Sequence, residues 1–180
     1  MKKTALLLLL FLGYFQANAQ KISTKTGSLK FEASVASFEE VAAENKNTSA
    51  ILETSTGDIA VLALMKGFRF KVALMEEHFN ENYVESDKFP KATFKGKIED
   101  FDSTKLSSVV KIFKISGDLT LHGKTKKIST TAKISKSGDK TTIIGNFDVK
   151  PEDFAIEIPK IVSKKVADVI QVTFNLSLSK

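Results

Sequence analysis

Apolar and polar residues alternate over most of the chain. Between Phe113 and Leu121 every second residue is apolar or glycine, and the residues between them are polar. Successive side chains of an extended chain point to opposite sides, so this pattern predicts strands with one apolar face and one solvated face. The same alternation recurs in 29–35, 92–99, 127–134 and 170–178.

Short turn signals separate the alternating stretches. Gly57, Gly67, Gly123 and Gly138 each lie in a polar dipeptide or tripeptide, and glycine tolerates the positive φ that tight turns need. Short connections join antiparallel neighbours. Many alternating strands joined by tight turns predict an all-β sandwich or barrel.

Residues 73–83 depart from the alternation and predict a helix. Met75, Phe79 and Tyr83 recur at a spacing of four, which places them on one face of an α-helix. The Phe89-Pro90 pair that follows marks the start of the next strand. This apolar stripe has two interpretations, an ordinary helix that closes the core and a helix that lines an opening of the barrel.

Three other segments carry expectations about local structure. Residues 37–43 resemble a short helical turn, with Ser37 as a possible cap and two glutamates in the first turn. Residues 159–165 form either a short helix or a loop. Residues 59–65 are apolar at almost every position, which predicts a strand covered on both faces, with the following helix as one cover.

The N-terminal residues are typical of a secretory signal peptide. Lys2 and Lys3 precede an apolar run over 5–15, and Ala17 and Ala19 supply the small residues of a cleavage site. The alternative, an uncleaved anchor, would need a longer apolar run of ~20 residues. Cleavage after Ala19 predicts a periplasmic or secreted protein, with residues 20–180 as a single domain and without cysteine for disulfides or a lipid anchor.

Charge argues against nucleic acid as the partner. The formal net charge is +6, but Arg69 is the one arginine, and the lysines are spread along the alternating stretches. Nucleic-acid readers concentrate arginine and basic stripes on one face. The lysines fit a solvated exterior, with transient contact to an anionic membrane surface left open.

Three motifs resemble the YceI-like family. Ile115 to Ile128 reads Ile-Ser-Gly-Asp-Leu-Thr-Leu-His-Gly-Lys-Thr-Lys-Lys-Ile, which is similar to the family's strand-turn-strand signature. Phe89 to Gly96 is similar to its Tyr-Pro-x-Ile-Thr-Phe strand entry, and Phe147 to Ile156 occupies the place of an Arg-x-Asp-aromatic segment. The resemblance covers almost all of 20–180.

The chain departs from the family pattern in the helix and beyond it. The family's Arg-Asp-x-His-Leu string is Met-Glu-Glu-His-Phe here, ending at Phe79, and Lys150 stands near the place of an arginine. The resemblance implies a lipocalin-like antiparallel barrel of about eight strands with a helix capping one opening. It also implies a carrier of isoprenoid or other long-chain lipids that is not an enzyme and needs no cofactor.

The candidate binding residues are apolar and mostly aromatic. Fourteen phenylalanines, two tyrosines and no tryptophan suit a hydrocarbon ligand, because phenylalanine offers no polar group. The same rings could instead fill the barrel solidly, and periodicity does not decide between a cavity and a packed interior. The candidates in the barrel and at its mouth are Phe31, Phe70, Leu74, Met75, Phe79, Phe94, Phe113, Leu119, Phe147 and Phe174.

Other chemistry finds little support in the sequence. The two histidines, His78 and His122, lack the convergent partners of a metal site, and a helix-surface residue and a hairpin residue are the simpler interpretations. There is no cysteine nucleophile, Gly-x-Ser-x-Gly elbow or glycine-rich phosphate loop. The alternative function is a ligand-free barrel that acts in protein interaction or stress. The oligomeric state is open, and a dimer is compatible with the sequence.

Overall fold

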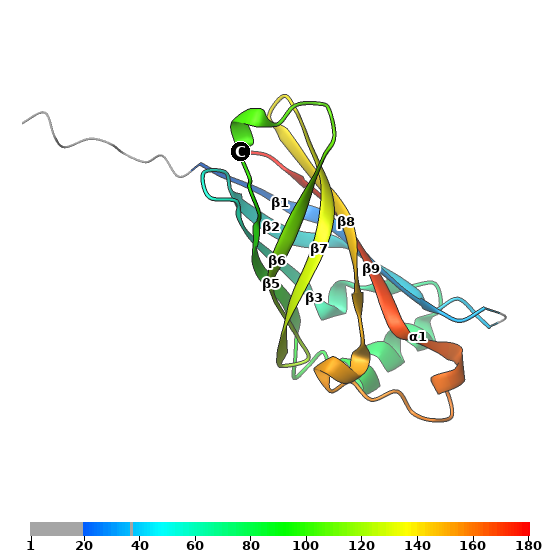
Figure 1. Ribbon diagram of the computed structural model, residues 1–180. Coiled ribbons are helices and arrows are strands. Elements are labelled where there is room, and N and C mark those ends of the chain that lie inside the picture. The colour runs from blue at the N-terminus through cyan, green and yellow to red at the C-terminus, as the bar shows by residue number, and fades with distance from the viewer. Residues whose placement is uncertain (1–19, 37) are drawn as a thin grey trace, which may run out of the picture.

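The computed structural model describes residues 20–36 and 38–180 (Figure 1). The expected signal peptide over 1–19 and the expected helix cap Ser37 lie outside the described residues. Within them, eight strands close into an antiparallel barrel. The strands, including one short extra strand, are β1 (Lys21–Ser34), β2 (Ala42–Glu53), β3 (Asp58–Leu64), β4 (Arg69–Phe70), β5 (Lys91–Ile98), β6 (Lys111–Leu121), β7 (Lys124–Ser137), β8 (Lys140–Val149) and β9 (Val166–Leu178).

The barrel closes because β1 pairs on both of its sides. The strand order is β1-β9-β8-β7-β6-β5-β3-β2, and β1 also pairs with β2. The two-residue β4 pairs with the start of β2, where β3 does not reach it, through Ala43 opposite Phe70. Closure gives every long strand two partners and so removes the open sheet edge that a sandwich would have.

The β6–β7 hairpin shows how turn residues set the register. The pairing runs without a shift from Lys111 opposite Ile134 to Leu121 opposite Lys124. His122 and Gly123 form the turn with φ of 48° and 70°, and two positive φ values match the twist of the flanking strands. The expected turns at Gly57 and Gly138, both at positive φ, are confirmed as well.

The alternation places the expected residues inside the barrel. Ile115 and Leu119 on β6 are buried, whereas Lys114 and Asp118, which precede each of them, are exposed. The buried residues form two clusters, one at each end. The cluster at the end that holds the C-terminus includes Leu52, Ile98, Ile134, Ile143 and Leu178, and the loop between β5 and β6 covers it with Phe101 and Leu106.

The expected helix lies at the opposite end of the barrel. Helix α1 (Ala73–His78) continues into a π-helical turn, η2 (Phe79–Tyr83), so that together they span the expected 73–83. It lies across the end where the β1–β2 connection, the β6–β7 turn and the β8–β9 connection also meet (Figure 1). No helix in the described part of the chain is long and apolar enough to cross a membrane. The remaining helical turns are η1 (Met65–Gly67), η3 (Ser103–Lys105), η4 (Pro151–Phe154) and η5 (Ser163–Lys165).

Two local expectations are wrong. Among the described residues of 37–43 there is no helical turn, because Ala42 and Ala43 already belong to β2 and pair with β1. The strand over 59–65 is not covered on both faces, since Leu64 is 54% exposed on the outside. A closed barrel is a single layer of sheet, and α1 covers its mouth instead of the wall beside β3. The open choice at 159–165 resolves to a loop that ends in η5.

Candidate ligand-binding site

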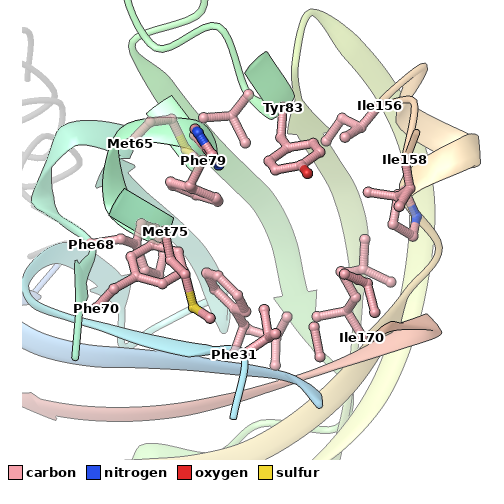
Figure 2. Close-up of a pocket in the computed structure, with 18 of the residues that line it drawn as sticks. Phe31, Met65, Phe68, Phe70, Met75, Phe79, Tyr83, Ile156, Ile158 and Ile170 are labelled. Carbon is pink, nitrogen blue, oxygen red and sulfur yellow. The ribbon is translucent and has the colours of Figure 1, made fainter. Parts of the chain in front are cut away.

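A cavity of about 420 Å³ lies inside the barrel beneath α1. Its size is within the range of small-molecule sites, roughly 300–1,000 Å³. Strands β1, β3, β5, β6, β8 and β9 supply its walls, and η1, α1, η2 and the β8–β9 connection surround its mouth. Figure 2 shows these side chains facing one another across the space. The barrel is therefore not filled solidly by side chains.

Small residues on neighbouring strands leave room for this cavity. Ala63 on β3 lies directly opposite Ala92 on β5, and both contribute to the cavity wall. Larger side chains at either position would occupy the space. The cavity therefore depends on the small size of the side chains at these two positions.

Four phenylalanines form one aromatic cluster on the helix side of the cavity. Phe79 from η2 lies 5.5 Å from Phe31, 5.9 Å from Phe68 and 5.1 Å from Phe70, measured between ring centroids. Phe31 also lies 5.6 Å from both Phe68 and Phe70. Tilted and edge-on contacts at these distances are favourable beyond simple burial. The cluster fixes η2 to the barrel wall.

Aromatic rings packed on glycines close the end of the cavity that lies farther from α1. A Cβ built on Gly145 would lie 2.5 Å from Cζ of Phe174, and one on Gly96 would lie 2.5 Å from Cζ of Phe94. The missing side chains let these rings lie against the wall. A smaller cavity of about 80 Å³ lies at this level, bordered by Phe94, Phe174 and Phe147.

The structure brings most of the sequence candidates together at this site. Phe147 borders both cavities, Phe94 and Phe174 border the small one, and Phe113 borders neither. Phe113 instead packs against Phe101 in the loop that covers the far end, with 6.0 Å between the ring centroids. The candidates that line the large cavity are Phe31, Phe70, Leu74, Met75, Phe79, Leu119 and Phe147.

Sequence reasoning missed Met65 and Phe68 at one wall of the cavity. Both are buried and lie in or beside η1, where the alternation of β3 breaks off. The nearby Lys66-Gly67 pair indicates a turn but gives no sign of where its apolar neighbours point. A second group was missed on the opposite wall. It comprises Ile156, Ile158, Ile170 and Val172.

Polar groups border the cavity only near its mouth. Among the described residues that line it, the ionisable or hydroxylated side chains are Glu39, His78, Tyr83 and Lys165. The Tyr83 hydroxyl points towards the cavity in Figure 2. An apolar chain could therefore lie inside while a polar end group remains near water.

His122 connects three segments at the rim of the barrel. Its Nδ1 donates to the Phe154 carbonyl at 3.0 Å, and its Nε2 lies 2.8 Å from Oε2 of Glu85, just after η2. Its ring also meets the Phe89 ring edge-on, with 4.5 Å between centroids. The hydrogen bond from His122 holds the pKa of Glu85 below its ordinary value. His122 is thus a hairpin residue, as expected. It also holds Glu85, just after α1 and η2, against the barrel rim.

No metal site or catalytic constellation is evident in 20–36 and 38–180. Among these residues no group of three or more histidine, cysteine, aspartate or glutamate side chains is placed to hold a metal ion. His78 lines the cavity, whereas His122 contacts Glu85. The arrangement provides mainly apolar surface around the cavity.

Comparison with known proteins agrees with this fold. The model of the YceI-like domain matches residues 15–178. A polyisoprenoid-binding domain from Saccharophagus degradans is similar in structure, with a TM-score of 0.76 and 16% identity over 88% of this chain and 97% of that chain. BcnA of Burkholderia cenocepacia gives a TM-score of 0.68 and 18% identity over 83% and 95% of the two chains.

A third similar structure is the YCEI protein of Campylobacter jejuni, with a TM-score of 0.64 and 20% identity over 81% and 88% of the two chains. No curated protein matches the sequence. The family model spans nearly the whole chain. The chain belongs to the YceI-like domain family.

Proposed function

We propose that this protein binds the apolar chain of an amphiphilic lipid, isoprenoid or acyl, inside the barrel and carries it through water. The observation that carries the proposal is a cavity of about 420 Å³ whose polar lining groups lie only at the mouth. The chain would enter tail first, and its polar end would remain near Tyr83 and Lys165. Nine of the ten candidate residues border one of the two cavities, and we assign no binding role to Phe113.

The free energy for binding comes from removing hydrocarbon from water. Burial of roughly 300 Å² of ligand surface contributes about 7 kcal/mol at 25 cal/mol per Å², before the cost of immobilising the ligand. The rings of the aromatic cluster hold one another in place through their mutual contacts. A preformed wall lowers the ordering cost of binding.

An isoprenoid is our first choice of ligand. The similar Saccharophagus degradans domain is named as polyisoprenoid-binding. Phenylalanine-rich walls suit branched, unsaturated hydrocarbon because they offer flat apolar faces without hydrogen-bond donors. A straight acyl chain would meet the same walls, so the two ligand types have to be compared directly.

We also propose that residues 1–19 are a cleaved signal peptide and that the protein works in the periplasm or outside the cell. The support is the order of lysines, apolar run and small residues in the sequence. The exported protein should begin at Gln20. Intact mass measurement of protein recovered from the exported fraction tests this, and a mass that includes residues 1–19 would contradict it.

Native mass spectrometry of the exported protein, followed by organic extraction, tests the binding function. We expect a stoichiometric co-purifying lipid, or binding of a polyprenol or quinone when it is offered to the apo protein. Fatty acids of similar length provide the comparison between ligand types. A clean apo mass with no uptake of any of these compounds would contradict the proposal.

A second function is favoured by an apolar patch on the outside of the far end. Val109, Val110 and Ile112 are exposed there, Ile112 by 70%, and Ile144 lies beside them across Lys133. Exposed apolar patches mark interaction surfaces. A ligand-free barrel that binds another protein through this patch would show an oligomer or complex that Ile112→Ser disrupts.

A further inference from the structure

One corner of the cavity rim presents an exposed apolar side chain. Ile161, in the connection from β8 to β9, is 88% exposed, more than any other large apolar residue described. The turn around it is held by hydrogen bonds, from the Val162 and Ser163 N–H groups to the Pro159 carbonyl and from the Lys165 N–H to the Val162 carbonyl. Ile161 therefore points to solvent in an ordered turn.

The same turn carries three exposed lysines, Lys160, Lys164 and Lys165. None of them lies within 4 Å of a carboxylate in the described chain. Some lysines elsewhere on this end are paired with a carboxylate, as Lys71 is with Glu40 and Lys126 with Asp153. We call residues 159–165 the rim turn.

The rim turn is continuous with the wall of the cavity. Val162 and Lys165 line the cavity, as do Ile158 before the turn and Val166 after it. The chain thus alternates between the cavity and solvent at this corner, with Ile161 outside and Val162 inside. Whatever contacts Ile161 lies next to the entrance of the cavity.

Charges distinguish this corner from other exposed apolar residues at the same end. Phe38 lies beside Glu39 and Glu40, and Leu74 on α1 is followed closely by Glu76 and Glu77. Carboxylates at those positions would repel an anionic surface. In Figure 1 the rim turn lies at the same end of the barrel as α1, and it carries its three exposed lysines within six residues.

We propose that the rim turn docks the protein on the surface of an anionic lipid bilayer, with the cavity mouth beside the membrane. Ile161 enters the interface, and the three lysines lie among the anionic headgroups. Glu157 and Asp168 flank the turn in the sequence, so charge alone gives weak attraction and the apolar contact is required as well. Transfer of a lipid through this contact rests on the proposed carrier function; docking itself does not.

Vesicle flotation tests the docking. The exported protein is mixed with vesicles of phosphatidylcholine alone or with one part in four of phosphatidylglycerol. We expect binding to the anionic vesicles, at least tenfold weaker binding to neutral ones, and loss of binding in about 0.5 M salt because salt screens exposed charges. Equal binding to both kinds of vesicle, or binding to neither, overturns the proposal.

Variants locate the contact. Ile161→Ser and the triple change Lys160→Glu, Lys164→Glu and Lys165→Glu should each weaken binding to anionic vesicles about tenfold or more. The control for the apolar change is Ile112→Ser, which alters the exposed patch at the far end and should bind as the unaltered protein does. If the rim variants bind normally, or if the control loses as much, the rim turn is not the contact.

A charge control separates local contact from net charge. The triple change of Lys133, Lys136 and Lys140 to glutamate alters net charge equally on far-end strands and should leave most of the binding intact. Uptake of the neutral fluorophore N-phenyl-1-naphthylamine without vesicles reports on the cavity in the same variants. For the unaltered protein, normal uptake with no vesicle binding overturns docking alone, whereas vesicle binding without uptake counts against the carrier function.

Discussion

Phe79 is the residue that most directly connects the helical segment over the mouth, α1 and η2, to the candidate ligand site. Its ring contacts three other phenylalanine rings from β1, β4 and the segment after η1, and it also lines the large cavity. A ring in this position contributes to folding and to binding at once. Phe113 offers a comparison, because it packs at the far end and lines no described cavity.

Replacing each of these phenylalanines by alanine should separate the two contributions. Both variants should lose about 2 kcal/mol or more in the free energy of unfolding, since each ring is half-buried among apolar neighbours. Phe79→Ala should also raise the dissociation constant for N-phenyl-1-naphthylamine about tenfold, because it removes cavity wall. Urea unfolding and fluorescence titration measure these effects, and an equal loss of affinity in Phe113→Ala would contradict the assignment.

Gly145 determines whether the Phe174 ring can lie flat on the wall. A Cβ there would lie 2.5 Å from the ring and 2.8 Å from the Thr131 carbonyl oxygen, so something must shift. We expect Gly145→Ala to lower the free energy of unfolding by about 1–3 kcal/mol. Asn146→Ala on the exposed face of the same strand is the control, with a change within about 0.5 kcal/mol. Equal stability of both variants would contradict the close packing.

At the scale of elements, the rim is held together by the β6–β7 turn. His122 at its tip bonds to the Phe154 carbonyl and to Glu85, and Glu85 and Ala155 both adopt positive φ. The turn therefore connects Glu85, just after η2, to the start of the β8–β9 connection. The family motif around His122 has a structural explanation in these contacts.

The hydrogen bond between Glu85 and His122 predicts a pH dependence of stability at this part of the rim. Because the folded state lowers the pKa of Glu85 below its ordinary 4.5, the ionised carboxylate stabilises the fold above that pH, and this contribution is lost as the pH falls through the lowered value. The melting temperature of Glu85→Gln should be below that of the unaltered protein at pH 7, and the difference should shrink as the pH falls below 4.5. A constant difference between pH 7 and pH 3 would show that the charge is not involved.

The strands were predictable because their signal is local. Alternation with period two needs no knowledge of distant residues, so the inward faces of β1, β5, β6, β7 and β9 follow from the sequence. The pattern failed at β3, where outward apolar residues such as Leu64 look the same as buried ones. The helical turn expected over 37–43, from a serine cap and two glutamates in the first turn, was also wrong, because Ala42 and Ala43 pair with β1.

The sequence predicted that the binding site is apolar and aromatic, but not where along the barrel axis each of its residues lies. Alternation says that Phe113 and Phe147 face inward, yet it does not say how far along the barrel axis each lies. Depth depends on strand register and on which end α1 covers, and both are properties of the whole fold. The Phe174 ring lies against Gly145 on the paired strand β8, and the Phe94 ring lies close to Gly96 on its own strand and to Gly117 on β6. The positions of these rings therefore depend partly on contacts between strands.

At the scale of the whole molecule, the barrel is divided into a packed half and a hollow half. The packed half contains branched aliphatic residues such as Ile134 and Ile143 and is covered by the loop between β5 and β6. It supplies a core that does not depend on ligand or on disulfides. The hollow half can then retain a cavity without loss of the fold, because strand pairing continues through both halves.

Filling the hollow half should separate stability from function. Ala92→Leu places three additional carbons at the junction of the two cavities, opposite Ala63. The free energy of unfolding should not fall, and should rise by up to about 1 kcal/mol, because added apolar atoms enter empty space. Affinity for N-phenyl-1-naphthylamine should fall about tenfold, as should uptake of a co-purifying lipid.

The matched control for this change is Ala60→Leu, on the outer face of β3 one strand away. It adds the same atoms to a strand but leaves the cavity unaltered, so both stability and probe affinity should stay near those of the unaltered protein. A drop of more than about 1 kcal/mol in the unfolding free energy of Ala92→Leu would mean that the wall is already packed. Stable protein that still binds the probe normally would place the ligand elsewhere. Only retained stability with lost binding fits a cavity kept open by small side chains for a ligand.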